Sequence, residues 1–377
     1  MSITKIMKYL KKDVKQLYRN IRYFKIERKF NGKELADVQK EIQKVLKKRR
    51  GIYFCSEKTA RCLSDNWREG VKEENINEPE NLRFIENAVP VVLSGNENFA
   101  PYVAVMLQSL LENTNPKRKY HFIIFERGFS VKTKECLLNQ ISKFSYCSIN
   151  FIDMTSIFDG IPIVATNHVS TDGFSRLFIP YWFHKYPKII YLDSDMIAKA
   201  DIAELYDLDI KPSCMGAAVS QSVNRLLNNK KYTFFLSSAV FLYVENWFRC
   251  FNSGVLVFDT EKFREKISLI DLFSFAIYYT NRYKKRFNDQ DVLISLIKDD
   301  YYVLPPEWNY CWRSWHENEQ YFMPAPKGTK IIHFNSTTKP WKNISDIANN
   351  PDALEYREYA KNVQLFTDLQ GDTKKEE

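Results

Sequence analysis

The tripeptide Asp193-Ser194-Asp195 directly follows a short apolar run, Ile189 to Leu192, which predicts a buried strand. A strand points alternate side chains to the same face, so two aspartates spaced two apart can reach one point if the extended backbone continues. Converging carboxylates repel each other unless a cation lies between them. Open α/β sheets also bind ligands just beyond the carboxyl ends of their strands. The segment therefore indicates a metal site at a sheet edge, although an aspartate can also simply begin a loop.

The rest of the chain from residue 88 onward supports such a sheet. Short apolar runs alternate with amphipathic stretches, a pattern that predicts an α/β fold. We expect helices after Asn98, after Ser130, around Arg176 to His184 and after Asn350, the last with Leu354, Val363 and Phe366 on its apolar side. We expect strands at 89–94, 120–125, 148–152, 189–192, 215–219, 254–258, 301–304 and 330–334.

The composition excludes several classes of protein. With 377 residues, of which 45% are hydrophobic and 15% aromatic, the chain can form one large domain with extensions or two smaller ones. The densest apolar stretch, Phe234 to Phe248, is interrupted by polar residues and too short to span a bilayer. The N-terminus has no signal-peptide pattern. Seven scattered cysteines without a Cys-x-x-Cys motif argue against disulfides or structural zinc and predict a cytoplasmic location.

The net charge of +9 is concentrated in one terminal segment. Residues 1–50 contain 17 Lys+Arg and 5 Asp+Glu, a balance of +12, so the remaining residues carry 9 − 12 = −3. The near-neutral body is therefore not a nucleic-acid-binding domain by charge.

The basic segment 1–50 is predicted to be a helical arm. Apolar residues recur every three or four positions from Ile3 to Phe24, and again from Leu35 to Val45 beyond a break at Asn31-Gly32. A basic amphipathic helix can lie on an anionic membrane surface, here the inner face of the membrane. The stripe could instead pair with another helix and give a homo-oligomer, and its tyrosines could contact nucleic acid. Of these we favour the membrane surface. Residues 51–87 are expected to be a connector.

Four later segments could complete a site with the aspartates. Asn252-Ser253-Gly254 precedes a strand, and Gly254 would allow a close approach. Asn288 to Asp291 precedes a helix and exceeds the single polar residue that an N-cap needs. His333 ends a strand, and Lys339 follows six residues later. Each alone has an ordinary structural interpretation: strand entry, N-cap, structural histidine and solvated lysine.

Together these segments predict a divalent cation held by Asp193, Asp195 and His333 beside a lysine that can meet phosphate. Oxygen ligands suit Mg²⁺ and Mn²⁺, and the added imidazole favours Mn²⁺. A metal with a lysine can neutralise the charge that develops on a departing diphosphate.

The order Asp-x-Asp, Asn-x-Gly-Val, Asp-Gln-Asp, His and Lys-Pro-Trp resembles glycosyltransferase family 8, most closely its bacterial lipopolysaccharide α-glycosyltransferases. The resemblance covers residues 88–345, leaving 346–377 as a C-terminal helix with a disordered tail from Gly371. It implies a GT-A nucleotide-sugar-binding fold preceded by the basic helical extension. It also implies a UDP-sugar donor, either UDP-glucose or UDP-galactose, Mn²⁺, and retention of anomeric configuration.

The resemblance also implies roles for individual residues. Asp193, Asp195 and His333 match the metal ligands, and Asp289 and Gln290 match the catalytic pair near the anomeric carbon. Positions that match contacts to the donor are Asn96, Asn98, His168, Arg176, Asn252, Ser253, Ser336 and Lys339. Asn96 stands where some relatives have Asp, and Ser336 where relatives often have Gly, so the uracil and diphosphate contacts would differ there. The Phe-rich stretch from Ser220 to Arg249 matches nothing in the family, and we expect acceptor recognition there.

The function expected from these features is retaining transfer of a hexose to a cell-surface glycan or lipid-linked acceptor. Two alternatives stay open. A non-catalytic nucleotide-sugar-binding scaffold would use the same ligands without turnover. A metal-dependent phosphotransferase would use Asp193 as nucleophile but would have no use for Asp289, Gln290 or Lys339.

Overall fold

The computed structural model describes residues 77–159, 161, 163, 171–221, 249–282, 288–312, 314–316, 319–321, 324–342 and 347–373. The predicted arm 1–50, His168 and all but the ends of the stretch from Ser220 to Arg249 lie outside this set. By its contacts the chain divides into two units, residues 1–54 with 222–250 and residues 55–221 with 251–377. The helices and strands below belong to the second unit.

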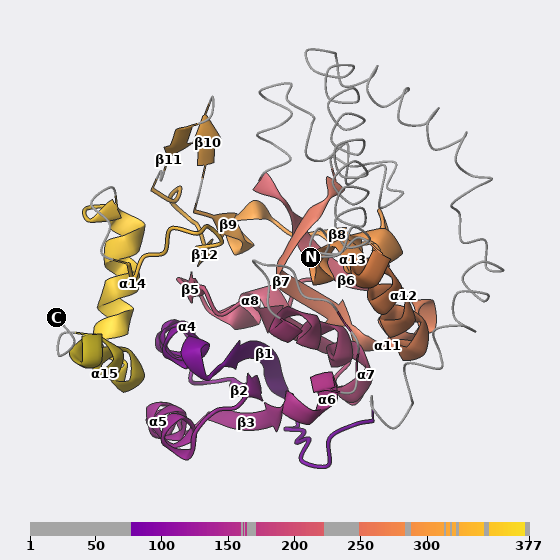
Figure 1. The fold of residues 1–377 in the computed structure, drawn as a ribbon, viewed down its shortest axis with the longest axis horizontal. Coiled ribbons are helices and arrows are strands. Elements are labelled where there is room, and N and C mark those ends of the chain that lie inside the picture. The colour runs from indigo at the N-terminus through magenta and orange to yellow at the C-terminus, as the bar shows by residue number, and fades with distance from the viewer. Residues whose placement is uncertain are drawn as a thin grey trace, which may run out of the picture. The chain divides into compact units, whose positions relative to one another are not determined.

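The second unit is built around a seven-stranded sheet with the strand order β3-β2-β1-β4-β7-β6-β8 (Figure 1). Its strands are β1 (Ala88–Asn96), β2 (Lys119–Arg127), β3 (Cys147–Asp153), β4 (Lys188–Leu192), β6 (Met215–Val219), β7 (Phe251–Asp259) and β8 (Tyr302–Val303). β3, β2, β1 and β4 run parallel to one another. β7 runs antiparallel to both of its neighbours, and β8 runs parallel to β6.

Smaller strands lie beside this sheet. β12 (Ile331–His333) pairs antiparallel with β5 (Met196–Ala198) and parallel with β9 (Tyr310–Cys311). β10 (Ser314–His316) and β11 (Glu319–Tyr321) form an antiparallel pair. The sequence predicts a strand at 330–334, which contains β12, but predicts neither β5 nor β9.

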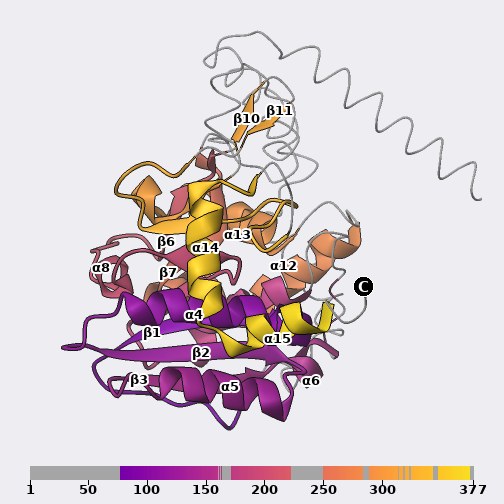
Figure 2. The same ribbon diagram turned by 90° about the vertical axis from the view of Figure 1, so that its left-hand side faces the viewer.

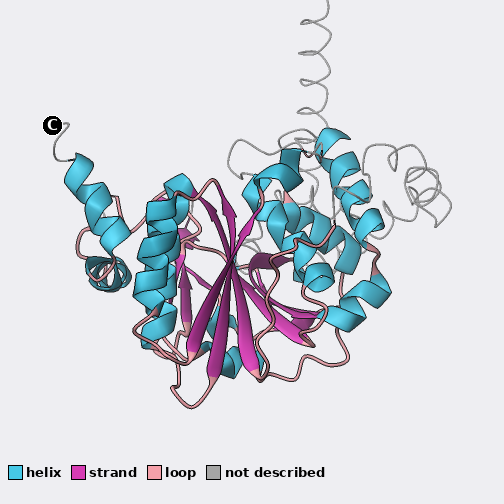
Figure 3. Cartoon of the chain, turned by 90° about the horizontal axis from the view of Figure 1, so that it is seen from below, coloured by secondary structure: helices cyan, strands magenta, loops and turns pink. Residues whose placement is uncertain are grey.

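Helices flank the fan of strands on either side, as Figure 3 shows. The helices that the structure describes are η3 (Glu97–Phe99), α4 (Ala100–Glu112), α5 (Val131–Ile141), α6 (Thr155–Asp159), η4 (Thr171–Phe178), α7 (Ile179–Trp182), α8 (Ile202–Tyr206), α11 (Thr260–Lys266), α12 (Leu269–Arg282), α13 (Asp289–Ile297), η6 (Pro306–Trp308), α14 (Pro351–Lys361) and α15 (Gln364–Thr373). In one group, α4 contacts β1, α5, α14 and α15. In the other group, α7 packs on α11 and on η4, and α13 contacts β7, α12 and η4.

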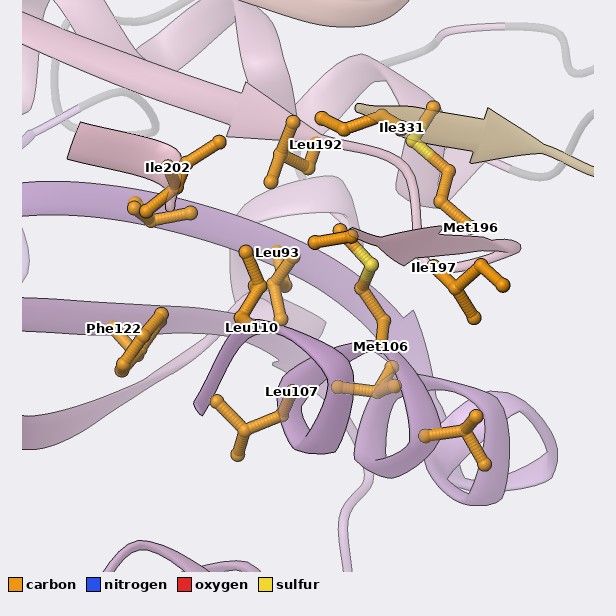
Figure 4. Close-up of a cluster of buried hydrophobic side chains, with 14 of the residues drawn as sticks. Leu93, Met106, Leu107, Leu110, Phe122, Leu192, Met196, Ile197, Ile202 and Ile331 are labelled. Atoms are coloured by element: carbon orange, nitrogen blue, oxygen red, sulfur yellow. The ribbon is translucent and has the colours of Figure 1, made fainter. Parts of the chain in front are cut away.

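A hydrophobic core cluster lies between α4 and the strands, where α4 presents a buried face of branched and sulfur-containing side chains (Figure 4). Met106, Leu107 and Leu110 of α4 are all 1% exposed or less. β1 is buried along almost its whole length, as expected for a central parallel strand covered on both faces. A strand that is buried on both faces needs apolar side chains at nearly every position, which explains the continuous apolar run in β1.

The C-terminal segment differs from the single helix that the sequence predicted. α14 begins at the Asn350 cap as expected, but it ends at Lys361, and a second helix, α15, contains Phe366 (Figure 2). Leu354 is 44% exposed, because the buried side of α14 is formed by Ala353, Tyr356 and Ala360, one position out of phase with it. α15 continues through Gly371 to Thr373, where the sequence suggested a disordered tail.

Within the described residues, no helix combines the length and the apolar character needed to cross a membrane.

A buried histidine on β2 makes the stability of this sheet depend on pH. His121 is 1% exposed, and its Nδ1 lies 2.7 Å from the Tyr186 hydroxyl, which also accepts the Ile85 N–H. The hydroxyl proton is therefore available for Nδ1, so the neutral imidazole fits and the protonated one does not. Burial, with a smaller effect of Arg83, lowers the pKa of His121 from 6.5 to about 4.

We predict that the protein loses stability as the pH falls below 6.5, because the unfolded chain then binds a proton that the folded chain rejects until about pH 4. By pH 5 this histidine alone lowers the free energy of unfolding by about 2 kcal/mol. Urea denaturation at pH 7 and pH 5 measures the change, which should shrink in His121→Gln and persist in His184→Gln, where the histidine is exposed. An equal pH effect in His121→Gln would contradict the assignment.

Candidate active site

Three potential ligands converge beyond the carboxyl end of β4. Asp193 follows β4 directly and its backbone N–H donates to Gly254 O at 2.8 Å, while the Asp195 carbonyl accepts from Phe334 N at 2.9 Å. His333 Nε2 lies 3.2 Å from Asp195 Oδ1 and 3.7 Å from Asp193 Oδ2. One ligand atom from each residue lies within 4.8 Å of the others. The predicted grouping of Asp193, Asp195 and His333 is therefore present.

The strand pairing explains why His333 reaches this point. β12 pairs with β5 so that His333 lies opposite Met196, the residue after Asp195. Ser194 turns away and its hydroxyl donates to Ser94 O at 2.6 Å, which holds the bend between the two aspartates. The carboxylates thus converge because β5 begins directly after them.

Gly254 makes room for the imidazole ring. A Cβ at this position would lie 2.4 Å from Cε1 and 2.8 Å from Nδ1 of His333, and 2.7 Å from the Met196 Cε. The sequence predicted a close approach at Gly254, and the group that approaches is the His333 side chain.

Lys339 is tied to the same cluster. Its Nζ donates to Asp195 Oδ2 at 2.6 Å and to Phe334 O at 2.7 Å. Burial opposes ionisation of Asp195, but Lys339 and His333 lower its carboxyl pKa. Burial likewise opposes protonation of His333, but the Asp195 carboxylate raises its pKa. The Asp195 carboxyl is therefore ionised, and its two oxygens contact His333 and Lys339.

Arg176 is buried at the centre of the site rather than exposed at its surface. It is 5% exposed, and its guanidinium donates to Asp193 Oδ1 at 2.9 Å and to the carbonyl and hydroxyl of Ser253 at 2.6 and 2.9 Å. Nε lies 3.0 Å from Asp289 Oδ2. The guanidinium carbon lies 4.3 Å from the ring centroid of Tyr191, whose hydroxyl also donates to Asp193. The sequence had not marked Tyr191 as part of the site.

The polar run before α13 serves both as cap and as site. Asn288 and Asp291 form a reciprocal capping box, which accounts for two of the four residues. Asp289 is 2% exposed and pairs with Arg176, and Ser253 Oγ lies 3.3 Å from its carboxylate. Gln290 Oε1 accepts from Ser253 N at 3.1 Å and Asn252 Nδ2 at 3.3 Å. Asp289 and Gln290 therefore join the metal-ligand cluster through Arg176 and β7.

The residues expected at the nucleoside lie at the end of β1. Asn96 caps η3 through Phe99 N and donates from Nδ2 to Asp172 Oδ2 at 2.9 Å. Asp172 also pairs with Arg127 at 3.1 Å. Asn98 is exposed in η3. The sequence did not indicate Asp172, because no local pattern links positions 76 residues apart.

Ser336 lies three residues before Lys339, is 5% exposed and donates to Thr338 O. Its hydroxyl therefore holds the loop that carries Lys339. His168 lies outside the described residues.

The three side chains could hold a divalent cation. Two carboxylates and an imidazole offer hard and intermediate ligands, and the ion would relieve the repulsion between the two carboxylates. His333 directs Nε2 at both carboxylates while Nδ1 lies 3.0 Å from Asn309 Oδ1. This division of the ring nitrogens is typical of metal-ligating histidines.

Comparison with known proteins points to one family. The family model described as glycosyl transferase family 8 matches residues 90–345. General stress protein A of Bacillus subtilis (strain 168) is 23% identical over 282 residues, 72% of this chain and 93% of the relative. A lipopolysaccharide 1,2-glucosyltransferase of Escherichia coli is 25% identical over 271 residues, 67% of this chain and 73% of the relative.

Among solved structures, the galactosyltransferase LgtC in complex with donor and acceptor sugar analogues superposes with a TM-score of 0.58 at 21% identity. The match covers 73% of this chain and 96% of that one. The GT-A fold expected from the sequence is confirmed by this likeness.

We predict that Gly254→Ala displaces the His333 ring and weakens Mn²⁺ binding by about 10- to 100-fold, the range seen when a metal ligand loses its support. Titration of Mn²⁺ followed by electron paramagnetic resonance measures the affinity. Gly216→Ala in β6 is the control, since its Cβ would meet Leu304 at 3.2 Å and Ile210 at 3.3 Å, gaps that small shifts can widen. Unchanged Mn²⁺ affinity in Gly254→Ala would show that His333 is not a ligand.

Proposed function

Because the chain belongs to glycosyltransferase family 8, we propose that it is a retaining hexosyltransferase that uses UDP-glucose or UDP-galactose as donor. The observation that carries the proposal is the convergence of Asp193, Asp195 and His333 within 4.8 Å beside Lys339. This is the arrangement that a sugar-nucleotide diphosphate requires, since it provides cation ligands and a lysine at one point.

In this proposal Asp193, Asp195 and His333 hold Mn²⁺, with Mg²⁺ as the alternative. The cation supplies charge neutralisation for the diphosphate as its bond to the sugar breaks. Lys339 contributes a second positive charge from the protein itself, and its present contact with Asp195 at 2.6 Å keeps it next to the ligands. A bound diphosphate would offer Lys339 additional anionic oxygens.

Asp289, Gln290, Asn252 and Ser253 are proposed to surround the donor hexose. The Asp289 carboxylate is paired with Arg176, and Gln290 Oε1 already accepts two hydrogen bonds. Oxygens engaged in this way are weak nucleophiles, which favours a role in orienting the sugar while the acceptor hydroxyl attacks from the face that the diphosphate leaves. Arg176 is proposed to support the donor indirectly, by fixing Asp193 and Asp289.

Asn96 and Asn98 are proposed to contact the nucleoside, His168 to belong to a segment that approaches the donor, and Ser336 to lie beside the diphosphate. Because Asn96 donates to Asp172, an amide and a carboxylate are adjacent there, and together they offer a uracil both a donor and an acceptor.

The acceptor is proposed to be a cell-surface or lipid-linked glycan. Support comes from the name of the Escherichia coli relative, a lipopolysaccharide glucosyltransferase. The stretch from Ser220 to Arg249 is proposed to recognise it. Residues 1–50, with a charge of +12, are proposed to hold the protein peripherally on the inner face of the membrane, with formation of a homo-oligomer as the alternative use.

We predict that Asp195→Asn lowers turnover at least about 100-fold while leaving the fold intact, because it removes a ligand charge at the sheet edge. UDP release from UDP-glucose and UDP-galactose with Mn²⁺ measures turnover. The control is Asp207→Asn, an exposed aspartate paired with Arg118 outside the site. Full activity of Asp195→Asn, or of the wild type in excess chelator, would eliminate the metal-dependent mechanism. Tight UDP-sugar binding without any release would instead indicate the scaffold alternative.

The stereochemistry provides an independent test. The donor carries an α-linked sugar, so a retaining enzyme gives an α-linked product. The coupling constant of the anomeric proton in the product's NMR spectrum distinguishes the two linkages. A β linkage would rule out retention.

Removal of residues 1–50 should abolish sedimentation with anionic vesicles but leave UDP-sugar hydrolysis intact, since the rest of the chain carries a charge near −3. Added salt should release the intact protein, because screening acts over a Debye length of about 8 Å at physiological ionic strength. If the intact protein ignores such vesicles and truncation converts an oligomer to a monomer, the helical-pairing interpretation holds instead.

A further inference from the structure

Asn309 is a buried residue that no motif in the sequence marks. It follows η6, directly precedes β9, and is 3% exposed. Its amide lies between His333 on β12 and Asn252 on β7. When one buried amide forms hydrogen bonds with two side chains on different elements, the orientation of one side chain constrains the orientation of the other.

Two backbone amides fix the direction of the hydrogen bonds in this region. Gly254 N donates to Asn252 Oδ1 at 3.0 Å, and Ser253 N donates to Gln290 Oε1 at 3.1 Å. Because a backbone N–H can only donate, the side-chain atoms facing these groups must be oxygens. Asn252 and Gln290 therefore have no freedom to flip their amide groups.

The orientation of Asn252 then decides that of Asn309. Asn252 Oδ1 is an acceptor, so Asn309 must present its amino group, and its Nδ2 lies 2.8 Å from that oxygen. The carbonyl end, Oδ1, is thereby directed at His333 Nδ1 at 3.0 Å. An amide oxygen only accepts, so Nδ1 carries the proton. The Cys311 thiol also interacts with the imidazole, but sulfur is a weaker acceptor than an amide oxygen.

The consequence reaches the opposite side of the ring. Nε2 faces the carboxylate oxygens Asp195 Oδ1 and Asp193 Oδ2, which only accept, so without a cation this nitrogen carries a proton as well. A bound cation would take the place of that proton, and because Nδ1 keeps its own proton toward Asn309, the lone pair of the neutral ring would then be on Nε2. Only a nitrogen with a free lone pair can bind a metal. The reverse tautomer would direct an N–H at the proposed ion.

We propose that Asn309 is a positioning residue: it selects the metal-binding tautomer of His333 and, through Asn252, links that ligand to Gln290. The link is completed by Asn252 Nδ2, which donates to Gln290 Oε1 at 3.3 Å. The metal part of this inference rests on the proposed function, whereas the tautomer rests on the hydrogen-bond directions alone.

Two substitutions distinguish the hydrogen bond between Asn309 and His333 from the hydrogen bond between Asn309 and Asn252. Asn309→Leu has a similar size and removes both hydrogen bonds. Asn309→Asp keeps an oxygen for His333 but places a second oxygen against Asn252 Oδ1, so it breaks the link toward Gln290 alone. The matched control is Asn150→Leu, since Asn150 is 6% exposed, pairs with Asn81 and Arg83, and lies on β3 at the far edge of the sheet.

Three measurements on the full-length chain decide the question. In ¹⁵N-histidine-labelled protein, the wild type should show an exchange-protected Nδ1–H signal of His333, assigned by its loss in His333→Gln. Asn309→Leu should lose this signal and bind Mn²⁺ about 10- to 100-fold more weakly. Asn309→Asp should keep the signal and an Mn²⁺ affinity within about threefold, while kcat for UDP-sugar hydrolysis falls about tenfold without a change in the Mn²⁺ requirement.

Each outcome is decisive. An unchanged Nδ1–H signal in Asn309→Leu overturns the inference, whatever the activity, and so does an equal loss in Asn150→Leu. If the wild type binds no Mn²⁺ and releases no UDP, yet only Asn309→Leu removes the signal, the hydrogen-bond chain stands and the proposed function fails. An Asn309→Asp variant with wild-type kcat would overturn the link to Gln290.

Discussion

The buried guanidinium of Arg176 is the interaction on which the site depends. Its donors reach η4 at Gly173 O, β7 at Ser253, the end of β4 at Asp193 and the start of α13 at Asp289. A charge this deeply buried costs several kcal/mol unless opposite charges satisfy it, and two carboxylates do so here. Asp193 and Asp289 raise the pKa of Arg176 against the opposing effect of burial, so it stays charged. The bond to Gly173 O lies within η4, the helix of Arg176 itself, so the guanidinium fixes η4 to three other elements, β4, β7 and α13, at one point.

The reversed direction of β7 makes this convergence possible. Because β7 runs antiparallel to β4, its first residues lie at the edge where β4 ends, with Leu192 opposite Val255. Asn252, Ser253 and Gly254 therefore enter the site from the start of a strand, whereas Asp193 enters from an end. A parallel β7 would place these residues at the opposite edge of the sheet, away from His333 and Gln290.

Local pattern was sufficient to predict the strands of the sheet and to select several residues that the structure brings close together, among them Asp193, Asp195 and His333. The apolar runs at 89–94 and 120–125 correspond to β1 and β2, because strands buried on both faces leave a continuous signal. The spacing of apolar residues after Asn350 predicted one helix with Leu354 on its buried side. The prediction is wrong, since Leu354 is exposed and the segment forms two helices. Apolar residues nine positions apart do not establish that one helix carries both.

The sequence by itself determined which chemical groups are available: carboxylates at Asp193 and Asp195, an imidazole at His333 and an ammonium at Lys339. Only the tertiary structure decided their relations. In the folded chain Arg176 is buried between two carboxylates, and the His333 imidazole lies against Gly254. Tyr191, Asp172 and Asn309 form hydrogen bonds with residues of the site. The reason is physical, because a residue type fixes what a side chain can donate or accept. Its partner depends on strand order and register, which no local stretch of sequence contains.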